Sequence, residues 1–444
     1  MPDAPDPADE APDDRHLGPA FTTVFTANLA SSLGDGIART AAPLLAIRLT
    51  TDPLLVSGIA ALALLPWLLL AIPSGILVDR IDRRLALALA NGLRAVLAAG
   101  LVALTATGSL TIGWLYVVVF LYGAGETVYD GAIRAVLPSI VPRRSLPAAN
   151  GRIEAGELVV QNFAAAPVTS ALFAVSALIP LGLNGAVYAV AAGLALALPR
   201  VASGRGGAPH ADDLLPWHRQ LSSGLVFLRG NAMLMRLWLL STAVGFFFSI
   251  GTSVFALYAI DRLGLPEALF GAFILTGAVG SIVGSVLAPR LALRWGAGPT
   301  MAVSTIVASL ALLLAGLVPT LWALGLAFAI SGGAVLIWNV LVMSLRQSII
   351  PRRLLGRVHG TWRTLLWGVM PLGSLIGGLL GRIDLTVPFL VGGAMSSVVG
   401  VLGFRFLAGL PDPQDVRNAD DEAGPTGGAP GPSAAGEAQR VAEA

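Results

Sequence analysis

The hydrophobic residues of this chain are gathered in long, almost uninterrupted stretches that recur along most of its length. A stretch of about 20 apolar residues is long enough to cross the hydrocarbon core of a bilayer as a helix. The pattern therefore predicts twelve membrane-spanning helices. They are expected near residues 20–48, 54–78, 85–108, 110–137, 148–174, 176–199, 233–260, 266–289, 297–318, 320–350, 354–381 and 384–408.

Polar segments divide the chain. Residues 1–19 and 409–444 are rich in Asp, Glu, Pro, Ala and Gly, a composition typical of disordered tails. Residues 200–232 separate the first six apolar stretches from the last six, and their helical spacing predicts an amphipathic helix on the membrane surface. A plain linker packed against the bundle is the alternative. The expected fold is an all-α integral membrane protein of two pseudo-symmetric six-helix bundles, 20–199 and 233–408.

Composition agrees with a membrane protein. Of the 444 residues, 55% are hydrophobic and 12% are charged, whereas soluble domains carry about 25% charged residues. The basic residues are all arginine, and half of them lie in the loops after the even-numbered helices, whereas the odd-numbered loops carry few. Positive charge marks the cytoplasmic side, so both termini are expected in the cytoplasm and the chain in the inner (plasma) membrane. The same distribution favours membrane orientation over nucleic-acid binding.

The two halves repeat at an offset of 209 residues. The segment around Pro142 returns around Pro351, and the same shift relates three glycines and the pair Tyr129-Asp130 to later positions. A parallel repeat of six-helix units is how many transporters place two moving halves around a central site. Under this shift Asp35, Glu126 and Asp130 of the first half correspond to Val244, Val335 and Asn339. Acids within the predicted spans therefore concentrate in the first half.

The segment between the second and third predicted helices reads G-I-L-V-D-R-I-D-R-R and resembles the loop signature of the major facilitator superfamily. The matching positions are Gly75, Leu77, Asp79, Arg80, Arg83 and Arg84. Asp82 stands where the family has glycine. The resemblance implies a cytoplasmic gating loop that latches the outward-open state. The alternative is an arginine cluster that only orients the chain in the membrane.

Further motifs resemble drug:proton antiporters of the macrolide-efflux and enterobactin-exporter type. They are Ser32 to Gly36, Gly125 to Asp130, Ala149 to Arg152, Ser344 to Gln347 and Leu354 to Val358. The resemblance covers residues 20–408. One departure is the fifth helix, where exporters often carry a glycine-rich G-x-x-x-G-P-x-x-G-G motif and this chain keeps only Pro167 and mostly small residues.

Charged residues inside the predicted spans are the candidate functional groups, because each costs on the order of 2.5–3.5 kcal/mol at mid-membrane. Asp35 lies in the first helix with Arg39 one turn further on. Glu126, Asp130 and Arg134 follow at intervals of four residues, on one stripe of the fourth helix. A carboxylate balanced between desolvation and a nearby arginine can change protonation as access changes. These five residues are therefore expected to couple transport to protons, and the resemblance places both helices beside a central cavity.

The competing interpretation is that these groups are permanent ion pairs that fasten helices together. For Asp130 with Arg134 the i, i+4 spacing supports either interpretation equally, whereas the depth of Asp35 and Glu126 favours function. Arg94 of the third helix is expected to pair with one of the acids. Glu154 and Glu157 are expected to stabilise the positive end of the fifth helix.

The second half offers fewer candidates. Trp338 and Asn339 repeat Tyr129 and Asp130, so Tyr129, Trp338 and Asn339 are expected to line a substrate cavity. Arg346 is expected to end the tenth helix at the membrane surface, and His359 receives no role.

Taken together, the sequence predicts a secondary transporter coupled to protons and working as a monomer. The resemblance implies that it exports amphiphilic small molecules such as drugs, macrolides or siderophore-like compounds. A major facilitator importer or facilitator of a metabolite is the alternative. A membrane enzyme is disfavoured, because the sequence has no H-E-x-x-H motif and no phosphate-binding loop. We expect no cofactor and no metal.

Overall fold

The computed structural model describes residues 17–142, 145–203 and 217–416. The first bundle consists of α1 (Pro19–Leu49), α2 (Pro53–Leu69), α3 (Ala71–Arg80), α4 (Arg83–Ala106), α5 (Ile112–Ile140), α6 (Leu146–Leu158), the π-helix η2 (Val159–Ala165), α7 (Ala166–Val175) and α8 (Leu178–Leu196). The helix α9 (Trp217–Gly230) leads to the second bundle. That bundle consists of α10 (Ala232–Thr252), α11 (Phe255–Leu257), the π-helix η4 (Tyr258–Arg262), the 3-10 turn η5 (Glu267–Leu269), α12 (Phe270–Trp295), α13 (Ala297–Leu317), α14 (Leu321–Ile349), α15 (Arg352–Gly381) and α16 (Val387–Ala408).

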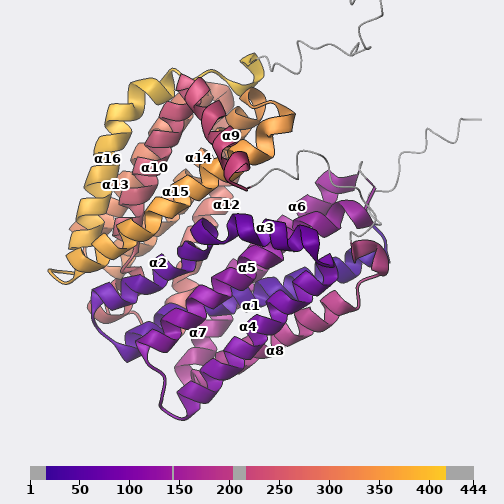
Figure 1. Cartoon of the computed structure of the whole chain (residues 1–444). Helices are drawn as coiled ribbons and strands as arrows, with labels where there is room; N and C mark the ends of the chain where they lie inside the picture. The colour runs from indigo at the N-terminus through magenta and orange to yellow at the C-terminus, as the bar shows by residue number, and fades with distance from the viewer. Residues whose placement is uncertain (1–16, 143–144, 204–216, 417–444) are drawn as a thin grey trace, which may run out of the picture.

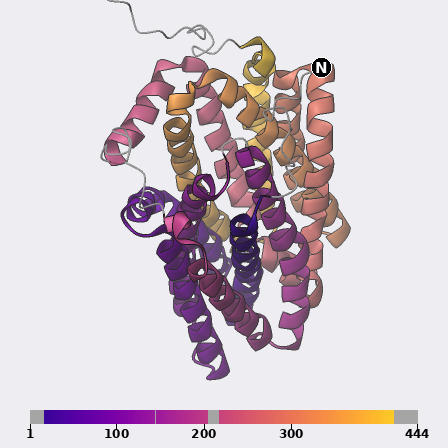
Figure 2. The same ribbon diagram turned by 90° about the vertical axis from the view of Figure 1, so that its right-hand side faces the viewer.

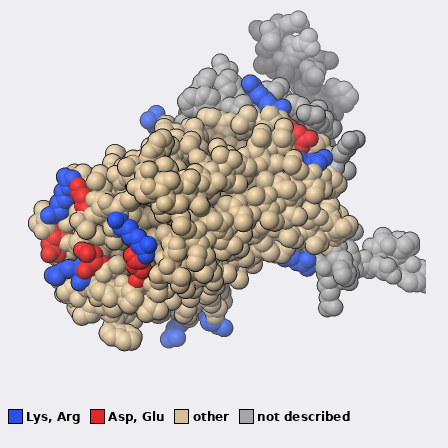
Figure 3. All heavy atoms as spheres, turned by 90° about the horizontal axis from the view of Figure 1, so that it is seen from below, with Lys and Arg blue, Asp and Glu red and all other residues tan. Residues whose placement is uncertain are grey.

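The all-helical prediction is confirmed for the described residues. Ten helical segments among them are long and apolar enough to cross a membrane. The other two predicted spans are occupied by α1 and by the pair α2–α3, of which α2 is a shorter apolar helix of 17 residues. On the face shown in Figure 3, a broad surface without charged side chains lies between charged groups near its two ends, as expected for a protein surrounded by lipid.

Two predicted spans are interrupted. The span predicted over 54–78 breaks at Leu70, between α2 and α3. Pro73 has no N–H to donate to the carbonyl of Leu69, one turn earlier, so that hydrogen bond is missing, although the Ser74 N–H still donates to the Leu70 carbonyl at 2.8 Å. The span predicted over 148–174 contains the π-helix η2, and Pro167 likewise cannot donate to the carbonyl of Phe163 within it.

Helix starts are fixed by side chains that accept hydrogen bonds from free backbone N–H groups. Asp52 caps α2 by accepting from the N–H of Leu54 at 3.0 Å. Asp82 caps α4 by accepting from the N–H of Arg84 at 2.9 Å. The residue that departs from the loop signature therefore has a structural use, because it begins the third span.

The bundles share the same internal arrangement. In the first, α4 packs on α8 and α2 on α5; in the second, α13 packs on α16 and α12 on α14. These pairs are equivalent under the sequence repeat. Figure 1 shows the two bundles inclined to one another, joined at the lower left and diverging toward the ends of the chain. Figure 2 shows the same helices from the side, with α9 at the edge of the molecule.

Three hydrophobic clusters show where the bundles meet. One cluster contains Leu44 and Leu45 from the end of α1 together with Leu257, Tyr258 and Phe389 of the second bundle. The other two clusters lie near the chain termini, and each contains residues of one bundle only. The bundles are therefore fused by a common core at the end remote from the termini, which we call the far end, and each has its own core at the terminal end.

Close helix contacts complete the far-end closure. Gly271 at the start of α12 lies against the backbone of Ala166 in α7, where a Cβ atom would collide with the Ala166 carbonyl. The Gly271 N–H donates to the Ser170 hydroxyl at 2.7 Å. Backbones can approach this closely only where the residue is glycine.

Two ion pairs also cross between the bundles at the far end. Arg48 lies 2.5 Å from Glu267, and Arg382 lies 2.5 Å from Asp52. Hydrogen bonding from Arg382 holds the pKa of the Asp52 carboxyl below its ordinary value. These pairs are partly exposed, so each contributes little to the free energy of unfolding. Their main effect is to fix how the two bundles align at this end.

Candidate functional site: a charged cavity between the bundles

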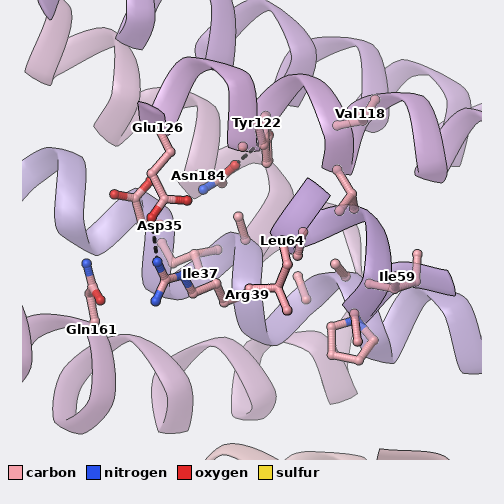
Figure 4. Close-up of a pocket in the computed structure, with 18 of the residues that line it drawn as sticks. Asp35, Ile37, Arg39, Ile59, Leu64, Val118, Tyr122, Glu126, Gln161 and Asn184 are labelled. Carbon is pink, nitrogen blue, oxygen red and sulfur yellow. Dashed lines mark hydrogen bonds and ion pairs between the residues drawn. The ribbon is translucent and has the colours of Figure 1, made fainter. Parts of the chain in front are cut away.

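A cavity of about 670 Å³ lies between the two bundles. Its wall is largely apolar, from residues such as Ile37, Ile59 and Leu64 of the first bundle and Phe270 and Ile274 of the second. Charged side chains enter it mainly from α1 and α5, as Figure 4 shows for Asp35, Arg39 and Glu126. A volume of this size holds a drug-sized molecule.

Asp35 is held by a fully buried arginine. Arg94 of α4, with no exposed surface, lies 2.6 Å from the Asp35 carboxylate. The Tyr188 hydroxyl donates to the same carboxylate at 2.7 Å. Arg94 also donates to Asn91 at 2.8 Å, and its guanidinium lies 5.1 Å from the centre of the Tyr129 ring. Because each buried charge is compensated by the other, this pair forms a fixed electrostatic element of the first bundle.

Glu126 is paired with the arginine expected near Asp35. The Arg39 guanidinium lies 2.5 Å from the Glu126 carboxylate, and 59% of the Arg39 side chain is exposed. The pair thus joins α1 to α5 where the cavity wall is accessible. Such a pair is easier to separate than a buried one, because water can solvate the arginine when the carboxylate leaves it.

Asp130 and Arg134 form the i, i+4 pair that their spacing indicated. Their charged groups are 3.2 Å apart, and both residues line the cavity. Asp130 therefore pairs within its own helix and makes no ion pair with Arg39 or Arg94 in the described part of the chain.

Glu157 is a cavity residue that the sequence interpretation missed. Its carboxylate accepts from the Asn28 amide at 2.9 Å, and the Tyr129 hydroxyl donates to the same Asn28 side chain at 3.2 Å. Among the described residues no arginine lies within ion-pair distance of it. Helix α6 begins at Leu146, so Glu157 lies three turns inside the helix and the helix-end explanation does not apply to it. The signal that could have located it is its depth in the apolar stretch.

The second bundle contributes a cation. Arg363 of α15 lines the cavity and lies 4.2 Å from the ring centre of Trp67 and 4.1 Å from that of Trp367. Trp67 belongs to α2, so this stack crosses between the bundles. The Nε atom of Arg363 is buried and has no hydrogen-bond partner among the described residues. Sequence reasoning gave Arg363 no role, although an arginine midway along a predicted span was a signal.

Two expected cavity residues do not line this cavity, and their placement is corrected. Of the predicted trio, Tyr129 lines it. Trp338 packs in the terminal-end cluster of the second bundle, and Asn339 is exposed. The repeat equates positions along the helices, but it does not equate the directions in which side chains face the cavity.

Arg346, expected to end its helix at the surface, is instead buried. It donates to Nδ1 of His359 at 2.8 Å and stacks on the Trp362 ring at 4.3 Å. Arginine has only donors, so this ring nitrogen must accept and the proton of neutral His359 lies on Nε2. The bond links the end of α14 to the beginning of α15.

The gating-loop residues contact the first bundle. Arg83 donates to the Ala135 carbonyl at 2.8 Å and Arg84 to the Leu196 carbonyl at 2.6 Å. Arg80 is exposed, and a Cβ atom at Gly75 would meet nothing within 4 Å. The side chain of Asp79 lies outside the described part. In this conformation Arg83 and Arg84 therefore donate to helix carbonyls of their own bundle.

Comparison with known proteins agrees with this architecture. A family model described as "transmembrane secretion effector" matches residues 16–422. Macrolide efflux protein A of Streptococcus pyogenes is 22% identical over 390 residues, which cover 86% of this chain and 94% of that protein. The protein of the same name from Enterococcus faecalis is 23% identical over 326 residues, 72% of this chain and 98% of that protein.

Solved structures share the fold at low identity. A bacterial homologue of the iron transporter ferroportin in an inward-facing state superposes with a TM-score of 0.71 at 18% identity, covering 88% of this chain and 99% of that one. A variant of the nucleoside transporter NupG superposes with a TM-score of 0.70 at 13% identity, covering 87% of this chain and 99% of that one.

Proposed function

We propose that this chain, which belongs to the transmembrane secretion effector family of major facilitator transporters, exports amphiphilic small molecules in exchange for protons. The observation that carries the proposal is the cavity between the bundles, whose largely apolar wall is interrupted by carboxylates. An apolar wall suits a hydrophobic substrate body, and carboxylates can hold either a proton or the basic group of a substrate. The likeness to macrolide efflux proteins supports export and bulky amphiphiles as the substrate class.

The orientation proposed from the arginines places both termini in the cytoplasm of a plasma-membrane protein. The far end is then extracellular, and the shared core there closes the cavity from outside. The terminal ends, whose hydrophobic clusters are separate, face the cytoplasm. The likeness to a structure in an inward-facing state supports this assignment. Transport by one chain would then proceed by rocking the bundles about the cavity.

Glu126 and Glu157 are the acids that we propose to exchange the proton. Glu126 is bonded to an exposed arginine, and Glu157 to the amide of Asn28. The charged groups acting on Glu157 are Asp130 and Arg134 of α5 and Asp35 of α1. Protonating Glu157 breaks no ion pair, so it is the less costly acceptor. By contrast, protonating Asp35 would leave Arg94 buried without a counter-charge, so we assign Asp35 to holding the site in shape.

Glu126 has a different set of neighbours. Arg39 and Asp35 act on it from α1 and Arg94 from α4, and Arg363 lies close enough in α15 to interact with it. Protonation of Glu126 releases Arg39 and so changes the charge facing a bound substrate. The two glutamates therefore differ in role: Glu157 exchanges the proton directly, and Glu126 controls a nearby arginine.

Energised everted membrane vesicles test the proposal with ethidium as a cationic amphiphilic probe. Wild-type vesicles should accumulate ethidium when the interior is acid and lose it when the gradient is collapsed. Glu157→Gln should abolish gradient-driven accumulation and Glu126→Gln should reduce it strongly. Glu154→Gln, an exposed acid one turn away on α6, should leave it unchanged. Equal gradient-driven accumulation by wild type and Glu157→Gln would refute the assignment, and no accumulation by any variant would count against proton-driven export of this class.

A further inference from the structure

The charges around the cavity do not all pair with one another. Three carboxylate–arginine pairs account for Asp35, Glu126 and Asp130. Of the charged residues that line the cavity, two remain outside these pairs: Glu157 in the first bundle and Arg363 in the second. Among the described residues, the cavity therefore presents one carboxylate and one arginine outside ion pairs, on opposite bundles.

Arg363 is arranged as a stacked arginine. Its guanidinium lies over the rings of Trp67 and Trp367, and the two rings are set edge to face at 5.5 Å. Among the described residues no carboxylate lies within ion-pair distance of it. Asp130, Arg134 and Glu126 act on it only at longer range. Its buried Nε has no hydrogen-bond partner in the described part of the chain, so this donor is not used there.

A guanidinium stacked on aromatic rings keeps its N–H edge free to bind an acceptor in its own plane. Charge-assisted bonds from such an edge to a carboxylate or sulfonate are strong, and frequently two-pronged. The flanking indoles would meanwhile pack on the aromatic body next to that anionic group. The three side chains thus supply the parts of a recognition site for an aromatic anion.

We propose that Arg363, Trp67 and Trp367 form a subsite for the anionic group of an aromatic amphiphilic substrate. This rests on the proposed export function, whose substrate class it narrows. With Glu157 accepting the basic group on the opposite bundle, the cavity is complementary to a zwitterionic amphiphile. The basic group competes with the proton, and the anionic group anchors the molecule to the second bundle.

Two probes with the same ring skeleton test the subsite directly. Anilinonaphthalene sulfonate carries an anionic group, and phenylnaphthylamine lacks it. Each would be titrated by fluorescence into purified protein in detergent, without any pH gradient. Because the micelle background is the same for every variant, differences between variants report the protein site.

Arg363→Gln should weaken binding of the sulfonate probe by about tenfold or more and change binding of the neutral probe by less than about twofold. Arg363→Lys keeps the charge but loses the planar edge, so an intermediate weakening is expected. It also provides the test if the glutamine variant does not fold. Arg236→Gln, an exposed arginine of α10, is the control and should match wild type.

The subsite would be overturned if Arg363→Gln or Arg363→Lys bound the sulfonate probe as tightly as the wild type does. It would also be overturned if either variant bound both probes equally more weakly. The measurement also separates the two proposals. If Arg363→Gln loses binding of the sulfonate probe while the wild type shows no gradient-driven ethidium transport, the subsite is supported and the transport proposal is refuted. If the wild type transports ethidium but Arg363→Gln binds the sulfonate probe as the wild type does, the transport proposal is supported and the subsite is refuted.

Discussion

Replacing Asp35 by asparagine should strongly destabilise the first bundle, because it leaves Arg94 as an uncompensated buried charge. Arg94 has no exposed surface, and Asp35 is its only ion-pair partner in the described part of the chain. Removing one member of a buried pair costs about 3–5 kcal/mol. The hydrogen bonds that remain to Asn91, Ser31 and the Ala90 carbonyl, and the ring contacts of Tyr129 and Tyr188, offset a little of this. We therefore expect a loss of about 3 kcal/mol.

The assay is thermal unfolding of the purified protein in detergent, followed by the loss of monodisperse protein. A loss of about 3 kcal/mol corresponds to a fall of about 6–12 °C in melting temperature for a bundle of this size. The double variant Asp35→Asn with Arg94→Met should recover most of that fall, since no charge is then left buried. Asp130→Asn, which breaks a more exposed i, i+4 pair, should cost about 0.3–0.5 kcal/mol. A melting temperature for Asp35→Asn as high as that of Asp130→Asn would refute the reasoning.

Three further predictions concern the far end. Gly271→Val should prevent far-end closure, because its Cβ atom would collide with the Ala166 carbonyl. A cysteine placed at Ile59 should then react faster with a thiol reagent added from the far side, whereas Gly92→Val, which faces open space, should react at the wild-type rate. Equal reaction rates in the two variants would count against the closure. The chain has no native cysteine, so a short, reducible bifunctional thiol reagent should link the two cysteines of the variant Arg48→Cys with Glu267→Cys. The linked protein should lose transport until the link is reduced. Full transport by the linked protein would contradict alternating access. The Asp52–Arg382 pair should persist at neutral pH and be lost as the pH falls below the ordinary carboxyl pKa of 3.8, because the folded-state pKa of Asp52 is depressed. The rate at which the cysteine at position 59 reacts from the far side should therefore rise only in that acidic range. An equal rise in Asp52→Asn would exclude Asp52 as the cause.

Much of the helical architecture could be predicted because a membrane span has a nearly fixed length and composition. The interruptions were harder to predict. The break at Leu70 and the π-helix η2 both involve prolines that remove a backbone donor, but many prolines lie inside continuous helices of this chain, such as Pro43 in α1. Whether a proline breaks a helix depends on the neighbouring helices that satisfy the freed carbonyl, and a single sequence does not contain that information.

Some residues of the candidate site could be predicted because a charged side chain is costly in lipid and therefore points to a function. That reasoning located Asp35 and Glu126, which both line the cavity. It did not assign Arg39 to Glu126 or Arg94 to Asp35, because pairing depends on how the helices rotate against one another. Glu157 was assigned to a helix end although the predicted start at residue 148 lies close to the observed start at Leu146, because its distance of nine residues from the predicted start was given no weight.

The most direct measurement for the account is proton release on substrate binding. Ethidium would be added to purified protein in weakly buffered detergent solution near neutral pH, and the change in pH recorded with an indicator dye. If substrate and proton compete for Glu157, binding should release protons from the wild type, and Glu157→Gln should bind ethidium with much smaller release. Ethidium binding without proton release in the wild type, or with equal release in Glu157→Gln, would contradict the central claim.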